Sequence, residues 1–390
     1  MTPPDSQARI ENWFVRRGVP HFIHNYSATE DVFTRALPVL IFWFLLSSIN
    51  GADVDGSWRQ MIFASLAGLG LLLLSGIGLN RLRNRPLLSR PQRVGWLEIA
   101  IFLVVPAALP VIFLQDWTVA WGILIDQIIV LIVVFAVTSY GLIAISVWSM
   151  RRLFKTLGQT FRLFTKALPL LLVGFMFLFI NNESWQTAGT LDPALLWTVT
   201  GCFGVLSAIF LASQIPKELR NQNQFSSWDE AIMLADDAPV TMEVKPHKPI
   251  ETKKLGKRQA GNLWLMVFVT QAFRLILVSI LIGLLFISLG LLIIQPTTVE
   301  LWTREPPEIV FSSSWQIFGN PVVLTIELLQ VALFLGGFAG VYFSVYATTD
   351  KTLRSEFFED TVHEVRQNLA ARCIYLENVI YQEPIPAAQT

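Results

Sequence analysis

Two carboxylates lie at corresponding positions in apolar parts of the sequence. Asp126 follows Ile125 and Glu327 follows Ile326, and each is followed by a long apolar run that ends in basic residues. A charge inside a membrane span is costly and therefore marks a candidate functional site. If the two carboxylates met, one pKa would rise, and the pair could share a proton or bind a cation. If each lies in the first turns of its helix, near a membrane surface, it instead stabilises the helix N-terminus. Both interpretations stay open.

Further residues are candidates for roles in or near the membrane. Arg274 precedes an apolar run, where it serves either as an anchor at the inner membrane surface or as a buried counter-ion. Pro38 and Pro169 open two short apolar runs and are candidate helix breaks, which in transporters accompany substrate sites. His21 and His24 have a spacing that could bind a metal, but we prefer packing at the membrane surface.

Motifs of well-known enzyme classes are missing from the sequence. It has no Gly-x-x-x-x-Gly-Lys-Ser/Thr phosphate loop, no Gly-x-Gly-x-x-Gly turn, no His-Glu-x-x-His motif and no Gly-x-Ser-x-Gly nucleophile elbow. Cys202 and Cys373 give neither a disulfide framework nor the spacing of metal ligands. We therefore expect no catalytic residue, no metal, no cofactor and no nucleic-acid partner.

The composition is that of a membrane protein. Of the 390 residues, 53% are hydrophobic and 15% are charged, whereas soluble domains have about 25% charged residues. A spanning helix needs about 20 apolar residues, and six runs reach about that length while two are shorter. In chain order the eight runs are 36–49, 61–79, 96–114, 127–148, 167–180, 194–215, 275–294 and 322–347. The predicted fold class is all-α, a polytopic transmembrane helix bundle of about eight spans.

The distribution of Lys and Arg predicts the topology. Basic residues concentrate in five segments that alternate with pairs of predicted spans, and the connections between them hold only Arg59 and Arg304. Because cytoplasmic loops carry the basic excess, all five segments belong on one side. This predicts a cell-membrane protein with both termini in the cytoplasm. Trp117, Trp185 and Trp302 are then expected at the outer membrane surface.

An internal repeat relates the two halves of the chain. Residues 33–38, FTRALP, match residues 164–169, FTKALP, and the match continues at Leu40/Leu171, Phe44/Phe175 and Asn50/Asn181. Each copy begins a block of four predicted spans, so we expect two parallel repeats, 33–150 and 151–350. The small residues in Ala64-x-x-x-Gly68 and Gly336-x-x-x-Gly340 are expected to allow close packing of helices.

Three segments are expected outside the membrane. Residues 1–32 form a cytoplasmic or interfacial N-terminal segment, and the polar stretch 216–262 is a cytoplasmic linker or a docking loop. Residues 351–390 form an amphipathic helix and tail, with apolar residues at alternating spacings of three and four. This helix, at 353–380, either packs on the protein's own cytoplasmic face or binds a protein partner or a second copy of the chain.

The N-terminal sequence ENWFVRRGVPHFI, residues 11–23, precedes the FTRALP block. Together they resemble a group of uncharacterised multi-spanning membrane proteins of actinobacteria. The resemblance covers residues 1–50 and implies a bacterial cytoplasmic membrane. It implies no activity, so no site residue is carried over from it.

Two functions fit these features. The first is a transporter or transport-associated permease of unknown substrate, favoured by the parallel duplication and the paired short helices. The second is a non-catalytic membrane scaffold or envelope assembly factor that acts through the cytoplasmic loop and the C-terminal helix. An enzyme acting on a lipid substrate ranks third. Membrane lipids are the expected partners in each case.

Overall fold

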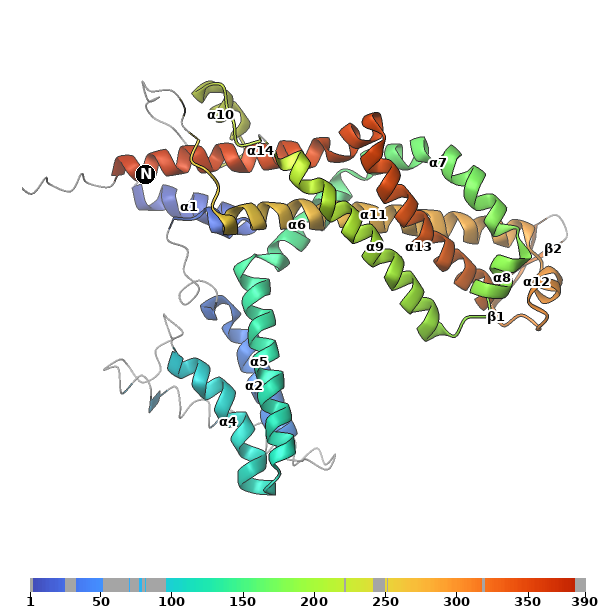
Figure 1. The fold of residues 1–390 in the computed structure, drawn as a ribbon, viewed down its shortest axis with the longest axis horizontal. Helices are drawn as coiled ribbons and strands as arrows, with labels where there is room; N and C mark the ends of the chain where they lie inside the picture. The colour runs from blue at the N-terminus through green and yellow to red at the C-terminus, as the bar shows by residue number, and fades with distance from the viewer. Residues whose placement is uncertain are drawn as a thin grey trace, which may run out of the picture. The chain divides into compact units, whose positions relative to one another are not determined.

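The structure of the chain, a computed structural model, describes residues 3–24, 33–51, 96–220, 222–240, 252–317 and 320–382, with isolated positions at 70, 77, 78, 81 and 250. Most of these residues are helical (Figure 1). The predicted span 61–79 and the motif Ala64-x-x-x-Gly68 lie outside the described residues, apart from three isolated positions. The chain forms two compact units, one of Pro20–Ala144 and one of Met1–Val19 together with Ile145–Thr390.

Five of the described helices are long and apolar enough to cross a membrane. They are α5 (Trp117–Ser139), α7 (Leu157–Phe179), α9 (Pro193–Leu219), α11 (Lys257–Ile293) and α13 (Ile326–Thr349). Two shorter apolar segments lie within α2 (Phe33–Gly51) and α4 (Trp96–Leu114), and the bounds of α4 are those of the predicted run. The chain is therefore an α-helical membrane protein.

In the unit Pro20–Ala144, helices α2, α4 and α5 pack on one another. Ala36, Leu40 and Phe44 recur every four residues along α2 and are buried together with Phe102 of α4. This spacing brings side chains to one face of a helix, so the core is a single apolar stripe of α2 against its neighbours.

The predicted run 127–148 differs from the helix that forms. Helix α5 begins ten residues earlier, at Trp117, because the carboxylate of Asp116 caps it and accepts hydrogen bonds from the amides of Thr118 (2.8 Å) and Val119 (3.1 Å). It ends at Ser139, and Gly141 takes a left-handed conformation (φ 64°) before α6 (Leu142–Lys155) begins. The predicted single span is thus divided between two helices.

In the second unit, α13 packs along α11 and α9, and α7 lies against α11 and α13. The predicted close packing at Gly336 and Gly340 is confirmed. A Cβ atom on Gly336 would come within 2.9 Å of the carbonyl oxygen of Ser279 in α11, and one on Gly340 within 2.2 Å of the Ser279 hydroxyl. Glycine at these two positions therefore sets how closely α13 approaches α11.

One end of this helix bundle, here called the hairpin end, carries α8 (Asn182–Ala188), α12 (Pro296–Thr303) and an antiparallel hairpin of β1 (Ile309–Ile317) and β2 (Asn320–Thr325). The hairpin was not predicted. Trp185 is fully buried here, and its indole N–H donates a hydrogen bond to the carbonyl of Phe179 at 2.7 Å. Its ring fills the space between α8 and its neighbours, and its predicted position near the outer membrane surface stays a prediction.

The opposite end is a layer of helices, here called the α14 platform. It consists of α1 (Pro3–Arg16), α6, α10 (Trp228–Leu234), the first part of α11 and the long α14 (Lys351–Gln382) (Figure 1). Helix α11 has 37 residues, a length of about 55 Å. A hydrocarbon core is about 30 Å thick, so a single straight helix belongs to both the membrane bundle and the platform.

Candidate functional site

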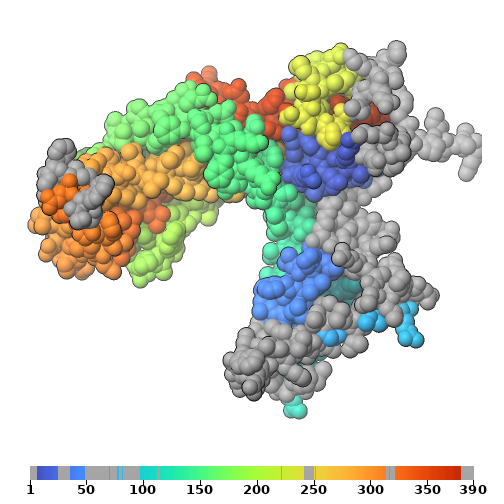
Figure 2. Space-filling model, turned by 180° about the vertical axis from the view of Figure 1, so that it is seen from behind, coloured from blue at the N-terminus to red at the C-terminus, as the bar shows by residue number. Residues whose placement is uncertain are grey.

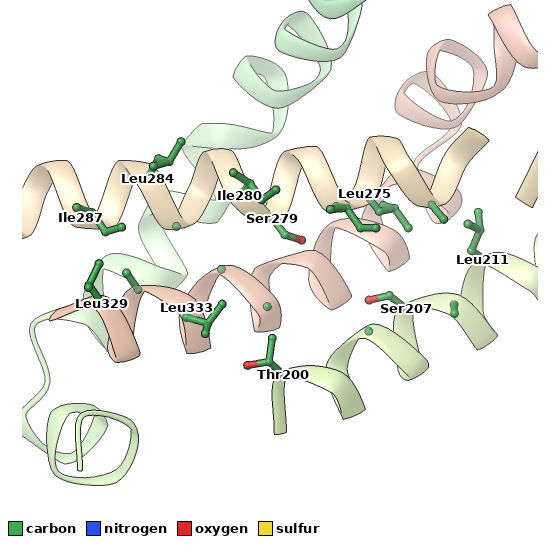
Figure 3. A pocket seen from close by; sticks show the side chains of 18 residues that line it. Thr200, Ser207, Leu211, Leu275, Ser279, Ile280, Leu284, Ile287, Leu329 and Leu333 are labelled. Carbon is green, nitrogen blue, oxygen red and sulfur yellow. The ribbon is translucent and has the colours of Figure 1, made fainter. Parts of the chain in front are cut away.

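A groove of about 650 Å³ lies between α9, α11 and α13. Side chains from all three helices line it (Figure 3). Along α11 the lining extends from Ala272 to Ile287, a length of about 22 Å. The groove therefore follows the helices for more than the depth of one leaflet, which is about half of the 30 Å core.

The groove is apolar. The described residues that line it carry no charge, and their only polar side chains are the hydroxyls of Thr200, Ser207 and Ser279. The Thr200 hydroxyl oxygen is buried and has no hydrogen-bond partner among the described residues. Such a lining suits an apolar chain and gives no path for an ion, because an ion needs polar groups to replace its water.

Small residues open the groove. Its lining contains seven glycines and alanines, namely Gly204, Ala208, Ala272, Gly283, Ala332, Gly336 and Gly337. On α13, Gly337 faces Thr200 and Phe203 of α9, where a Cβ atom would come within 3.2 Å. On α9, a Cβ atom on Gly204 would meet nothing within 4 Å. The space over Gly204 is thus free to receive a larger side chain or a ligand.

Arg274 lies where α11 meets the α14 platform. Its side chain is 3% exposed, and one guanidinium nitrogen donates to the carbonyl of Phe357 at 2.7 Å. The other pairs with the Asp360 carboxylate at 3.1 Å. The buried ion pair is what the counter-ion role requires, and the choice between the two predicted roles stays a prediction. The partner is on α14, and no sequence pattern predicts that Arg274 pairs with this helix.

The acidic residues of α14 form a ladder with basic residues from three other helices and with Arg17, which follows α1. Glu356, Asp360 and Glu364 recur every four residues and so lie on one face of α14. Glu356 pairs with Lys166 of α7, and Asp360 with Arg274. Glu364 pairs with Arg17 at 2.7 Å and with Arg152 of α6 at 3.3 Å.

Packing and hydrogen bonds complete the α14 platform. The Tyr375 hydroxyl donates to Glu11 of α1 at 2.9 Å, and Gln271 of α11 donates to the Thr361 hydroxyl at 3.0 Å. Arg366 pairs with Glu230 of α10. The apolar face of α14, which includes Phe357, Val365 and Leu369, is buried by the chain itself. Of the two predicted roles for this helix, packing on its own chain is the one present here.

Burial and hydrogen bonding shift the pKa of several platform residues. Burial lowers the pKa of the Arg17 guanidinium and raises the pKa of the Cys373 thiol. A hydrogen bond from the backbone amide of Ser226 lowers the pKa of Glu230, and Arg366 adds to the effect. The lowered pKa keeps the Glu230 carboxylate charged at neutral pH, where it can pair with Arg366.

The predicted carboxylate site is only partly described by the structure. Glu327 is the second residue of α13, and its side chain accepts a hydrogen bond from the amide of Glu308 at 3.0 Å. Asp126 is exposed on α5 and lies nine residues after Trp117, so it is not in the first turn. The two residues belong to different units. Their pairing stays a prediction.

The two prolines do not break their helices. Helix α2 continues through Pro38 to Gly51, and α7 begins twelve residues before Pro169 and continues past it. Helix α7 extends this far because residues 157–166, which look like a basic loop in the sequence, bury Thr160, Leu163 and Phe164 on one helical face.

Sequence reasoning missed the groove and the ladder. The spacing of Glu356, Asp360 and Glu364 is visible in the sequence, and it could have indicated a charged helix face opposite basic segments. The groove has no such signal, because its small residues come from three helices far apart in the chain.

Five membrane-length helices, an apolar groove and a charged platform define a multi-pass α-helical membrane protein. Comparison of the chain with protein-family models, with curated proteins and with solved structures finds no match.

Proposed function

We propose that the protein is a membrane permease, or a transport-associated protein, that binds a lipid-like molecule in the groove between α9, α11 and α13. The groove itself is the observation that carries this proposal. It lies among helices long enough to cross a membrane, and its flanks expose Val205, Ile209, Ile276 and Ile280. Apolar side chains exposed in this way face lipid in a membrane protein. A molecule dissolved in the membrane can then enter from the side.

An acyl chain fits the dimensions and chemistry of the groove better than an ion or a sugar. The lining offers about 22 Å of apolar surface along α11. The hydroxyls of Thr200, Ser207 and Ser279 are neutral and few. A charged or strongly polar substrate would lose its hydration without gaining partners there.

Eight spans in two parallel repeats are part of the proposal. Arg17 and Arg152 both pair with Glu364, so all three residues lie on the same side of the membrane. The chain must then cross an even number of times between Arg17 and Arg152, and again between Arg152 and Glu364. Helices α7, α9, α11 and α13 supply four crossings in the second interval. In the first, α2, α4, α5 and the predicted span 61–79 would supply four.

The repeat is supported by burial. Ala36, Leu40 and Phe44 are buried on α2, and the residues 131 positions later, Ala167, Leu171 and Phe175, are buried on α7. Helices α2, α4 and α5 pack on one another, as do α7, α11 and α13. The matching residues of α2 and α7 thus form the buried face of the helix in each half. The basic excess assigns the α14 platform to the cytoplasm.

The test fills the groove without disturbing the helix. Gly204→Leu adds a side chain where a Cβ meets nothing within 4 Å, and Gly201→Leu, one turn away, is equally open but is not part of the groove. Wild-type protein and both variants are reconstituted in vesicles with a fluorescent phospholipid, and transfer of the probe between leaflets is measured. We expect transfer with wild type and Gly201→Leu and its loss with Gly204→Leu. Equal transfer by all three, or none above protein-free vesicles, would overturn the proposal.

A scaffold role is the second candidate, and the α14 platform favours it. Five helices from distant parts of the chain meet in one charged layer. Because the apolar face of α14 is already buried, a partner would bind the exposed side of the platform. Co-purification in mild detergent distinguishes the two roles. A stoichiometric protein that is lost on removal of α10, with no lipid transfer in vesicles, would favour the scaffold.

A further inference from the structure

The corner where α6 ends and α7 begins combines uncompensated positive charge with exposed apolar side chains. No acidic residue occurs between Asp126 and Glu183. Arg151, Lys155 and Arg162 are exposed and form no ion pair among the described residues, whereas Arg152 and Lys166 pair with Glu364 and Glu356. The corner thus has three cations without ion pairs, next to the paired Arg152 and Lys166.

Large apolar side chains lie among these cations. Phe154 is 64% exposed, Phe161 54% and Leu157 41%, and Met150 continues the row along α6. Figure 2 shows α6 and the start of α7, in green, on the face turned toward the viewer. Aromatic and basic side chains alternating on one surface are typical of the zone where a membrane protein meets lipid headgroups.

Between Lys155 and Arg162 the surface is hollowed. This notch has a volume of about 440 Å³ and is lined by Lys155, Thr156, Gly158, Gln159 and Arg162. Gly158 leaves it open, because a Cβ atom there would meet nothing within 4 Å.

The first turn of α7 borders the notch. The Thr156 hydroxyl donates to the carbonyl of Arg152 at 3.0 Å and so does not cap α7, which has no side-chain cap. The first amides of this 23-residue helix therefore add partial positive charge beside the two cations. The notch is suited to a phosphate oxygen.

The acidic groups nearest to the notch lie on α14. Glu356, Glu359 and Asp360 share a neighbouring depression with Arg162 and Lys166. Glu356 and Asp360 are already paired, with Lys166 and Arg274. The notch itself is lined by no carboxylate, and Glu359, which forms no ion pair among the described residues, faces Arg162 only from the neighbouring depression.

We propose that the α6–α7 corner binds the phosphate headgroup of an anionic phospholipid. Lys155, Arg162 and the first amides of α7 hold the phosphate, while Phe154, Leu157 and Phe161 lie among the acyl chains. A free phosphate would use the cations but would leave these three apolar side chains in water, so the source is a lipid. Because α7 is long enough to cross the membrane, its first turn lies at a membrane surface, where such a headgroup is present. The site is separate from the groove and does not depend on the proposed transport.

The test compares variants of equal charge in the full chain. Lys155→Gln/Arg162→Gln removes the two cations of the notch. Lys254→Gln/Arg258→Gln removes two exposed cations elsewhere in the same unit that form no ion pair among the described residues. Each protein is purified from the same mixture of phosphatidylglycerol and phosphatidylcholine, and the bound lipid is measured by native mass spectrometry. We expect wild type and the control to keep phosphatidylglycerol, and the notch variant to lose it with an unchanged melting temperature.

Two further measurements complete the test. Lys155→Arg/Arg162→Lys keeps the charges, and we expect it to keep the lipid even if the neutral variant fails to fold. Inorganic phosphate is added to wild type in phosphatidylcholine nanodiscs, where we expect no binding. Phosphatidylglycerol retained equally by the notch and control variants would overturn the proposal, as would loss of the lipid from the charge-keeping variant. Saturable binding of inorganic phosphate without anionic lipid would overturn the assignment to a lipid.

Discussion

Individual charges in the α14 platform are buried in pairs, and this decides what their removal costs. The Glu364 side chain is 8% exposed and faces both Arg17 and Arg152, of which Arg17 is 14% exposed. Forming such a pair contributes little net stability, because both ions lose water. Breaking it leaves a buried charge without a partner, which is costly. The ladder therefore favours one arrangement of α1, α6 and α14 over others.

Neutralising Glu364 should destabilise the platform. We expect Glu364→Gln to lower the free energy of unfolding by about 3–5 kcal/mol, the usual cost of breaking a buried ion pair. Glu359→Gln is the control, because Glu359 is exposed and forms no ion pair among the described residues. Thermal unfolding in detergent measures the difference. Cys373 gives a second readout, since its half-buried thiol, whose pKa is raised, should react faster when α14 loosens. Equal stability of the two variants would contradict the buried-pair explanation.

Substitutions of Glu327 and of Asp126 should differ in how much they lower the stability of the protein. Glu327→Ala removes the acceptor for the Glu308 amide, and we expect a loss of about 1.5–3 kcal/mol, typical of a hydrogen bond to a charged group. Glu327→Gln keeps an acceptor oxygen and should lose less. Asp126→Asn changes an exposed residue and should leave the melting temperature unchanged. A large loss of stability in Asp126→Asn would indicate a partner for Asp126 and would favour the paired site.

At the scale of the element, sequence patterns predicted most helices but not their ends. The bounds of α4 followed from apolar length alone. The start of α5 did not, because apolar length alone does not show that residues 117–126 join the helix, whereas the cap at Asp116 sets its start. The same holds for α7, whose basic first turns look like a loop until Leu163 and Phe164 are seen to be buried. The candidate groove depends on how three helices cross, which no local pattern encodes.

The crossing of α13 and α11 gives a direct test of close packing. We expect Gly336→Ala to destabilise the protein by about 1–3 kcal/mol, because the new methyl group meets the backbone of Ser279, which cannot move alone. Gly201→Ala has open space around its Cβ and should instead stabilise α9 by up to about 1 kcal/mol. Thermal unfolding of both variants in the same detergent checks the opposite signs. If Gly336→Ala were as stable as wild type, the crossing would have to be wider than described.

Helix α10 should release from α14 at low pH. The pKa of Glu230 is lower in the folded protein than its ordinary value, so its contribution to stability is present above about pH 4.3 and is lost as the pH falls through the lower folded value. The difference in melting temperature between wild type and Glu230→Gln should therefore be largest at neutral pH and shrink in acid. Asp236→Asn, an exposed change in the same segment, is the control. A difference that grows on acidification would contradict the sign of the pKa shift.

At the scale of the whole chain, the membrane bundle and the platform are continuous within one unit. Helix α11 belongs to both, and α13 leads into α14 with a single non-helical residue, Asp350. The pair Arg274–Asp360 joins these two helices where they leave the apolar region. A change in how α9, α11 and α13 pack around the groove would thus be transmitted to the platform through two helices rather than through a flexible loop.

The last prediction concerns topology, which follows from the same ion pairs. Because Arg17, Arg152 and Glu364 meet, the segments that carry them share one side of the membrane, and the basic excess predicts that this side is the cytoplasm. Helix α7 is the single membrane-length helix between Arg152 and Trp185, so these two residues must lie on opposite sides. We expect reporters fused after Gly51, Trp185 and Pro307 to be active outside, and those after Arg85, Thr156 and Lys245 to be active inside. A cysteine at Glu183, which is exposed, provides a check in the full chain, and a membrane-impermeant thiol reagent should label it from outside. An inside signal at Trp185, together with protection of the cysteine at position 183, would contradict the eight-span topology. It would also contradict the even number of crossings on which that topology depends.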